Sequence, residues 1–310
     1  MTQPDSAVYR FDAIGAPWRI DTAEPLSANI VQAINARIDE FDRTYSRFRP
    51  DSLVTRINTT PGVWTLPADA PALLNLYRWL YERTDGAVSP LVGERMENLG
   101  YDSAYSLTPR TTSVRVPSWD DAISWDGETL TTVRPVLLDV GAAGKGYLVD
   151  IVAGILLDHG IGSFVVDASG DLLHRGDAPL SVALEDPRDA TRAIGVYELQ
   201  NAALCASASN RRAWGNGLHH IIDGITGVPT ASVIAAWAIA PTTLVADGLA
   251  TGLFFRGAAV FAADAPAEAV ADPSTSSIST STATTDFQYV RMFATGSVEY
   301  SRNLNGEMFT

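Results

Sequence analysis

The sequence contains a single cysteine, Cys205, among its 310 residues. An intrachain disulfide is therefore excluded, and we expect the thiol to serve as a small buried apolar side chain. Long apolar runs are also missing, since none approaches the roughly 18–20 residues that a membrane-spanning helix needs. The composition therefore predicts no membrane segment in this chain.

Basic residues are scarce as well. The 22 lysines and arginines are outnumbered by 36 aspartates and glutamates, which gives a formal net charge of −14 at pH 7. Nucleic-acid affinity depends on Lys and Arg side chains that neutralise phosphates. The charge balance therefore argues against a nucleic acid as a partner.

Export features are absent from the first residues. The segment 1–14 has no basic n-region, no apolar h-region and no lipoprotein cysteine. We expect a cytoplasmic protein as the sequence is written, or an exported one if an N-terminal segment was removed.

Helix and strand patterns alternate along the chain without an internal repeat. Apolar residues from Ile30 to Tyr45 recur at steps of three and four, which predicts an amphipathic helix that begins near Ser27. We predict further helices over 73–81, 148–156 and 244–255. Apolar runs predict strands over 122–125, 129–133, 136–140, 164–166, 180–184, 194–199 and 233–240, and a closing hairpin over 287–300.

The segment 262–286 differs in composition from its surroundings. It consists mostly of Ala, Ser, Thr, Asp, Glu and Pro. Such a segment cannot bury enough apolar surface to offset the entropy lost on ordering. We therefore expect a mobile Ser/Thr/Ala-rich insertion on the surface.

Three glycines follow the predicted strand over 136–140. Gly141, Gly144 and Gly146 lie between this strand and the predicted helix over 148–156. In that order of elements, backbone N–H groups and a helix N-terminus can face a phosphate. The spacing matches neither the Rossmann fingerprint nor a Walker A loop. A tight turn with close packing explains the glycines equally well.

Asp247 and Thr251 are four residues apart in a segment with helical apolar spacing. Residues i and i+4 share one face of a helix, so the carboxylate and the hydroxyl would project side by side. Two hard oxygens in this arrangement suit Mg²⁺, which completes its shell with waters and substrate phosphates. The alternative is that Asp247 caps a helix and Thr251 only packs.

His220 is the best acid–base candidate among four histidines. A histidine titrates near neutral pH and can accept a proton from an attacking hydroxyl. Asp223 is in a position to orient it, although a simpler role for Asp223 is to cap the following turn. The alternative for His220 is a hydrogen bond to a backbone carbonyl.

Six blocks of sequence resemble the motifs of one enzyme family, in the family's order. They lie at 41–52 with Asn58, at 84–87 with 99–101, at 139–150, at 166–171, at 219–229 and at 246–251. The block at 139–150, Asp-Val-Gly-Ala-Ala-Gly-Lys-Gly-Tyr-Leu-Val-Asp, resembles the glycine-rich motif of FAD:protein FMN transferases, the ApbE-like flavin transferases. The blocks extend over nearly the whole chain, so we expect a single domain spanning 1–310.

The resemblance implies a fold and an activity. The fold would be α+β, with the T-fold-related ApbE-like architecture, mixed β-sheets packed with helices, and a flavin site in a cleft between the two halves. The activity would be Mg²⁺-dependent transfer of the FMN moiety of FAD to a Thr or Ser hydroxyl of a partner flavoprotein, with release of AMP. The net charge is compatible with FAD, because a metal ion and backbone dipoles can offset the pyrophosphate.

The resemblance also assigns roles to residues. His220 would be the catalytic base, with Asp223 beside it. Asp247 and Thr251 would bind the metal together with a main-chain carbonyl from 142–144, placed at Gly144. The FAD-binding residues would be Ser46, Asn58, Gly141, Lys145, Asp150, Ser207, Arg211 and Thr226.

This chain departs from the family motifs at several positions. Leu99 replaces the usual Trp, Ala206 a Thr and Ala208 a Gly, and the segment 167–169 replaces Asn-x-Gly. Two other functions therefore stay open. The first is an FAD pyrophosphatase that forms FMN and AMP with water, and the second is a non-catalytic FAD-binding protein.

Overall fold

The computed structural model describes residues 7–262 and 287–309. Apart from Ala262, the predicted insertion over 262–286 lies outside the described residues. Within the described part of the chain, no helix is both long and apolar enough to cross a membrane.

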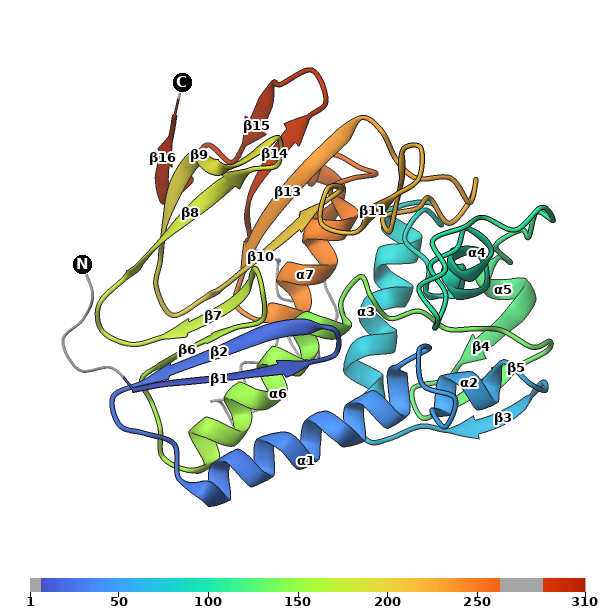
Figure 1. The fold of residues 1–310 in the computed structure, drawn as a ribbon, viewed down its shortest axis with the longest axis horizontal. Helices are drawn as coiled ribbons and strands as arrows, with labels where there is room; N and C mark the ends of the chain where they lie inside the picture. Colours follow the sequence, from blue (N-terminus) through green and yellow to red (C-terminus); the bar gives the residue numbers. More distant parts are fainter. Residues whose placement is uncertain (1–6, 263–286, 310) are drawn as a thin grey trace.

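An eight-stranded sheet forms the middle of the molecule, with the order β1-β2-β6-β7-β10-β13-β14-β15 (Figure 1). We expected sheets with both parallel and antiparallel strands. Every pairing between the strands of this sheet is antiparallel. The expected α+β fold is confirmed. The strands are β1 (Ala7–Ala13), β2 (Ala16–Thr22), β6 (Phe164–Asp167), β7 (Asp171–Arg175), β10 (Ala203–Ala208), β13 (Val233–Ala240), β14 (Gln288–Phe293) and β15 (Val298–Tyr300).

Helices cover one face of this sheet. The predicted helix after Ser27 is confirmed, because the Ser27 side chain accepts a hydrogen bond from the Ile30 N–H at the helix start. The other three predicted helices are confirmed: those over 73–81 and 148–156 are longer than predicted, and the one over 244–255 ends earlier, at Gly252. The four are α1 (Ala28–Tyr45), α3 (Ala70–Arg83), α6 (Gly144–Asp158) and α7 (Thr243–Gly252).

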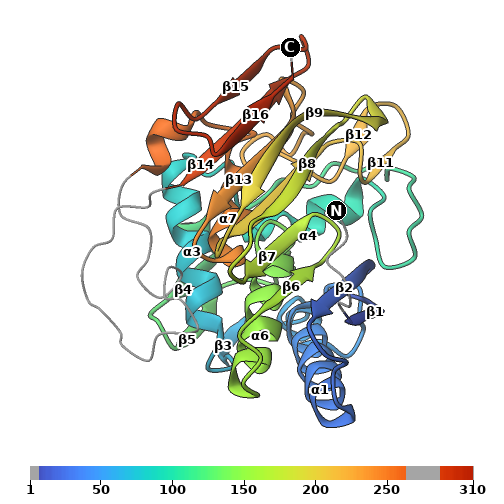
Figure 2. The ribbon, with the colours of Figure 1, turned by 90° about the vertical axis from the view of Figure 1, so that its left-hand side faces the viewer.

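A second, three-stranded sheet covers the opposite face of β10, β13 and β14 (Figure 2). Because side chains of a strand alternate between faces, β13 is buried on both sides. Trp237 and Ile239 pack toward the second sheet, whereas Ala236 and Ala238 belong to the core beneath the helices. This explains its uninterrupted apolar sequence. The second sheet consists of β16 (Gly306–Met308), β9 (Asp189–Leu199) and β8 (Leu180–Asp186).

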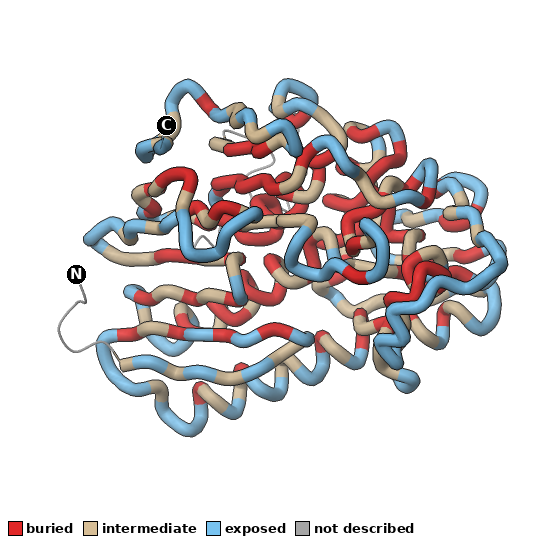
Figure 3. The backbone as a smooth tube through the Cα atoms, turned by 45° about the horizontal axis from the view of Figure 1, so that its top comes forward, coloured by how far each residue is buried: buried red, intermediate tan, exposed pale blue. Residues whose placement is uncertain are grey.

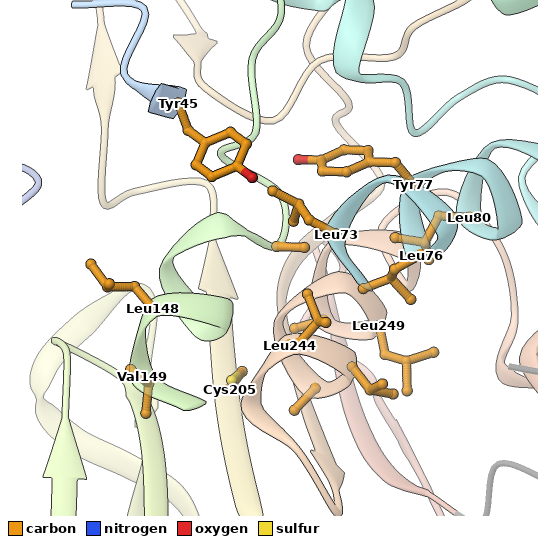
Figure 4. Close-up of a cluster of buried hydrophobic side chains, with 14 of the residues drawn as sticks. Tyr45, Leu73, Leu76, Tyr77, Leu80, Leu148, Val149, Cys205, Leu244 and Leu249 are labelled. Carbon is orange, nitrogen blue, oxygen red and sulfur yellow. The ribbon is translucent and has the colours of Figure 1, made fainter. Parts of the chain in front are cut away.

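The core under the helices is one continuous cluster of buried side chains. Figure 4 shows leucines of α3 beside those of α7, with Leu148 of α6 and Cys205 of β10 in the same cluster, and Cys205 is fully buried as expected. Burial is concentrated on these inner elements, and exposed residues lie on the outer loops (Figure 3).

The remaining elements surround this core. A small sheet with the order β3-β5-β4 contains the strands predicted over 122–125 and 129–133, which pair antiparallel as β4 and β5. These outer elements are α2 (Leu53–Ile57), β3 (Gly62–Thr65), η1 (Pro90–Val92), α4 (Gly93–Asn98), α5 (Trp119–Ala122), β4 (Ile123–Trp125), β5 (Thr129–Thr132), β11 (Ala213–Trp214), β12 (Leu218–His219) and η2 (Ala258–Phe261).

The predicted strand over 136–140 is wrong. The segment is apolar and Val136, Leu137 and Leu138 are buried, but no ladder forms there. Its backbone contact to another segment is a hydrogen bond from Asp139 N to Pro90 O at 2.8 Å. Burial alone produces the apolar run, so the pattern did not distinguish a strand from a buried connection into α6.

Candidate active site

A cavity of about 780 Å³ opens where the two halves of the chain meet. Its lining residues come from the β1–β2 turn, the end of α1, the segment 87–105, the glycine-rich turn, the β6–β7 turn, the end of β10, the segment 211–222, and α7 with the residues after it. The size falls in the range of ligand-binding pockets. The expected location of the site between the halves therefore corresponds to a real cavity.

Most of the predicted site residues line this cavity, although they come from distant parts of the sequence. Those that line it are Ser46, Gly141, Gly144, Lys145, Ser207, Arg211, His220, Asp247 and Thr251. Four predicted site residues do not line it: Asn58, Asp150, Asp223 and Thr226.

The glycine-rich turn brings the start of α6 against α7. A Cβ atom at Gly146 would lie 2.3 Å from Thr243 O and 2.6 Å from the Asp247 Cβ, so only glycine allows this approach. The Gly146 N–H donates a hydrogen bond of 2.9 Å to Asp247 Oδ2. One N–H of the helix N-terminus is thus used by the protein itself and positions Asp247.

Asp247 and Thr251 project from the same face of α7, as predicted. The Thr251 hydroxyl donates to Ala142 O at 3.3 Å, so a carboxylate, a hydroxyl and a carbonyl converge at the glycine-rich turn. The carbonyl that contacts Thr251 is that of Ala142, which lies in the predicted segment 142–144, and Gly144 is the first residue of α6. In the described residues, no group of three His, Cys, Asp or Glu side chains is arranged to hold a metal ion.

This oxygen set fits Mg²⁺, which uses few protein ligands and retains waters or substrate phosphates. Burial, together with the charge of Asp171, raises the pKa of Asp247 well above its usual range. The carboxylate is only 5% exposed. A bound cation would stabilise its ionised form, so the electrostatics favour a positive charge at this position.

Lys145 is predicted to contact the phosphates, and it lies on the cavity wall. Its Nζ atom is 2.6 Å from Asp171 Oδ2 and donates to Ala168 O at 2.7 Å. The neighbouring carboxylates, Asp171 first, hold the pKa of Lys145 above its usual value against the effect of burial. Lys145 is therefore a charged and already paired group, not a surface lysine.

His220 and its neighbour have different surroundings. His220 lines the cavity, and its Nδ1 atom is buried without a hydrogen-bond partner. Burial, followed by the positive charge of Arg212, lowers the pKa of His220 to about 4. The imidazole is therefore neutral at pH 7 and able to accept a proton. His219 instead makes a 2.7 Å hydrogen bond through Nε2 to Thr230 O.

Asp223 does not orient His220. Its Oδ1 atom accepts hydrogen bonds from the Ile225 and Thr226 N–H groups, at 2.7 and 3.1 Å. These bonds close the turn that follows, which is the simpler role considered for Asp223. Thr226 is an exposed residue of the same turn.

Asp150, on the neighbouring helix α6, binds the first residues of α7. Its carboxylate accepts hydrogen bonds from Thr243 N, Thr243 Oγ1 and Leu244 N, at 2.7–2.9 Å, and so caps the N-terminus of α7. Burial raises the pKa of Asp150 to about 6. The family motif residue at 150 thus holds the helix that carries Asp247, instead of lining the cavity.

Ser46, Ser207 and Arg211 line the cavity at separate points, whereas Asn58 does not line it. Ser46 ends α1, and Ser207 lies near the end of β10. Arg211 lines the cavity but forms an ion pair of 3.0 Å with Glu185. Asn58 caps the C-terminus of α2, away from the lining.

An aromatic and cationic wall was missed by the sequence reasoning. Phe48 and Tyr105 stack with ring centroids 5.5 Å apart, and Tyr101 contacts both edge-on. Arg47 lies 4.1 Å from the Phe48 ring and forms a buried ion pair of 2.6 Å with Asp139. Arg212 donates to the Tyr101 hydroxyl at 2.8 Å.

Part of this wall could be found in the sequence. Arg47, Phe48, Tyr101 and Asp139 fall inside blocks that resemble family motifs. Tyr105 carries no such signal, because its position depends on a loop in which its own φ is +50°. An aromatic cluster with cationic side chains beside it suits a planar heterocycle.

Comparison with known proteins gives a consistent result. A family model described as "ApbE family" matches residues 14–271. The FAD:protein FMN transferase of Escherichia coli (strain K12) is 26% identical over 258 residues, covering 74% of this chain and 72% of that protein. That of Klebsiella pneumoniae (strain 342) is 26% identical over 268 residues, covering 79% and 77%.

Solved structures share the fold. The flavin transferase ApbE from Vibrio cholerae superimposes with a TM-score of 0.75 at 21% identity, covering 96% of both chains. The apbe protein from Thermotoga maritima gives a TM-score of 0.75 at 23% identity, covering 96% of this chain and 97% of that one. The expected ApbE-like architecture is confirmed, and with the family model covering most of its length, the chain belongs to the ApbE family.

Proposed function

We propose that this protein transfers the FMN moiety of FAD to a Ser or Thr hydroxyl of a partner flavoprotein and releases AMP. The observation that carries the proposal is the shared cavity, in which His220 faces the same space as Asp247, Thr251 and the Ala142 carbonyl. Relatives that cover most of this chain carry the name FAD:protein FMN transferase.

The two ends of the cavity suit the two parts of the substrate. The glycine-rich turn and Asp247 form a polar end for the pyrophosphate, and Phe48, Tyr101 and Tyr105 form an aromatic end for a planar ring. A dinucleotide combines both features. Lys145 adds positive charge near the polar end, although Asp171 partly offsets it.

The reaction is a phosphoryl transfer. The oxygen of the acceptor hydroxyl attacks the phosphorus on the FMN side of the pyrophosphate, the P–O bond to AMP breaks, and AMP leaves with the bridging oxygen. The neutral His220 ring takes the hydroxyl proton. The products are an FMN phosphoester on the partner and AMP, and no oxidant or reductant is needed.

Magnesium is the proposed cofactor. Asp247, Thr251 and the Ala142 carbonyl would hold the ion, which would neutralise charge on the pyrophosphate when bound. The protein's own contribution is positioning: Asp150 and Gly146 set α7 against the glycine-rich turn, so that these oxygens converge.

The test is incubation of the protein with FAD, Mg²⁺ and a panel of peptides that each contain one Ser or Thr. Transfer raises the mass of an accepting peptide by that of FMN less one water, and releases AMP in equal amount. FMN and AMP without a peptide adduct would identify the pyrophosphatase instead. FAD that stays bound and intact in Mg²⁺ would identify a non-catalytic binding protein.

The variant Asp247→Ala tests the metal assignment, and it should abolish FAD cleavage while the protein stays folded. Asp186→Asn is its control, because Asp186 is also a buried carboxylate but pairs with Arg188 outside the cavity. Near-normal turnover of Asp247→Ala in Mg²⁺ would contradict the metal assignment.

A further inference from the structure

Two buried carboxylates share one lysine at the polar end of the cavity. Asp171, at the start of β7, is 1% exposed, and Asp247 of α7 is 5% exposed. Lys145, in the first turn of α6, is the cation beside them. All three line the cavity, so their pairing decides which carboxylate is open to a ligand.

The pairing is unequal. Lys145 Nζ forms an ion pair of 2.6 Å with Asp171 Oδ2 and donates a hydrogen bond of 2.7 Å to the Ala168 carbonyl. Among the ion pairs of the described residues, none joins Lys145 to Asp247. Asp247 instead accepts from the Gly146 N–H through Oδ2. Its other oxygen has no hydrogen-bond donor in the part of the chain that the structure describes.

Lys145 is nevertheless attracted by both carboxylates. Gly146, the next residue after Lys145, donates a 2.9 Å hydrogen bond from its N–H to Asp247 Oδ2, and Lys145 and Asp247 line the same cavity. In a buried site such attractions are weakly screened, and an ammonium group that loses one partner moves to another within reach. The flexible four-carbon stem of lysine permits such a move.

We propose that Asp171 is a positioning residue, which holds the Lys145 ammonium group away from Asp247 and so keeps the Asp247 carboxylate open for a divalent cation. This inference rests on the metal site of the proposed function. It assigns to the Lys145–Asp171 pair a role in cation binding that differs from a phosphate contact.

The test measures cation binding directly. Mn²⁺ takes the same oxygen ligands as Mg²⁺, and electron paramagnetic resonance reports the free ion. Asp171→Asn should weaken Mn²⁺ binding about tenfold or more, because Lys145 then pairs with Asp247 and a charge-assisted hydrogen bond must break before the ion binds. The measurement needs neither FAD nor turnover.

A second variant distinguishes competition of Lys145 with the cation for Asp247 from damage to the fold. Lys145→Met removes the competing cation and should bind Mn²⁺ at least as tightly as the wild type. The double variant Asp171→Asn/Lys145→Met should return to within about threefold of Lys145→Met, since the two changes act on one contact and are not additive. Damage to the fold would instead make the double variant bind more weakly than Asp171→Asn.

Asp186→Asn is the control for loss of a buried, paired carboxylate, and its Mn²⁺ affinity should equal that of the wild type. If Asp171→Asn and the wild type bind Mn²⁺ with equal affinity, the role of Asp171 is overturned, whereas the metal site of the proposed function is not. If the wild type binds no Mn²⁺, the metal site of the proposed function fails and this inference fails with it.

Discussion

The adjacent residues His219 and His220 differ in role because their rings lie in different surroundings. His219 is 8% exposed, and its ring is fixed at both nitrogens, through Thr230 O and the Ile221 N–H. His220 faces the cavity and has a buried Nδ1 without a partner. A ring fixed by backbone groups supports structure, whereas a neutral ring at the cavity is available for proton transfer.

Substitution of each histidine should therefore have a distinct effect. His220→Ala should slow flavin transfer by ~10²–10⁴-fold, with FAD affinity and melting temperature nearly unchanged. His219→Ala should lower the free energy of unfolding by about 1–3 kcal/mol, because the buried Ile221 N–H loses its acceptor. Steady-state kinetics and denaturant titrations of both variants provide the comparison. Equal rate losses would reduce His220 to a structural residue.

The pH dependence of the reaction also follows from His220. The active form of a general base is deprotonated, and the pKa of His220 is lowered to about 4 from an ordinary 6.5. As pH falls, the decline in kcat/KM for FAD that belongs to His220 should therefore lie toward about 4, since this parameter reports the free enzyme, whereas a decline near 6 would belong to Asp150, whose pKa is raised to about 6. Circular dichroism at each pH shows whether the protein remains folded. A midpoint near 6.5 would show that His220 is more exposed to water than the structure indicates.

At the scale of secondary structure, the contact between α6 and α7 builds the polar end of the site. Gly146 permits the close approach, and Asp150 of the same helix caps α7 one turn before Asp247. The glycine-rich motif therefore serves helix packing as well as any phosphate contact. Of the two interpretations that the sequence left open, close packing is confirmed at Gly146, and the phosphate contact stays a prediction.

Two glycine substitutions in α6 should have opposite effects. Gly146→Ala should destabilise the protein by about 1–3 kcal/mol and impair FAD cleavage, because the new Cβ forces α7 and Asp247 away. Gly154→Ala places its Cβ in open space and should stabilise by about 0.5–1 kcal/mol. Thermal denaturation and FAD cleavage assays of both variants test this. A harmless Gly146→Ala would mean that the two helices are less closely packed than described.

At the scale of the whole molecule, a single buried cluster joins the N-terminal hairpin to the last helices. It extends from Trp18 to Phe261 and includes side chains from α1, α3, α6 and α7. The cavity is likewise lined by residues from both the N-terminal and the C-terminal half of the chain. The larger core cluster and the cavity are therefore complete only when both halves of the chain are present.

The chain should therefore unfold as one unit. Tryptophans at 18, 79, 119 and 237 report on different regions of the core, so fluorescence and far-ultraviolet circular dichroism should give coincident denaturation curves. A saturating concentration of FAD with Mg²⁺ should shift the whole curve upward, because the ligand binds only the folded state. Two separated transitions would divide the chain into two domains.

The sequence alone determined the local elements and the residue types of the site. Helical periodicity identified α1, α3, α6 and α7, since side chains three and four residues apart share a face in any context. The i and i+4 spacing also placed Asp247 and Thr251 side by side. The distinction between His219 and His220 came from the family motif, and the structure places the two rings in different surroundings.

Only the tertiary structure decided how these elements meet. Gly146 and Asp247 are 101 residues apart in the chain, and their hydrogen bond exists because α6 packs on α7. The same packing selects the Ala142 carbonyl, assigns Asp150 to a helix cap and pairs Lys145 with Asp171. The segment 136–140 is buried but unpaired for the same reason. Local pattern depends on neighbours along the chain, whereas burial and partners depend on contacts that the whole fold creates.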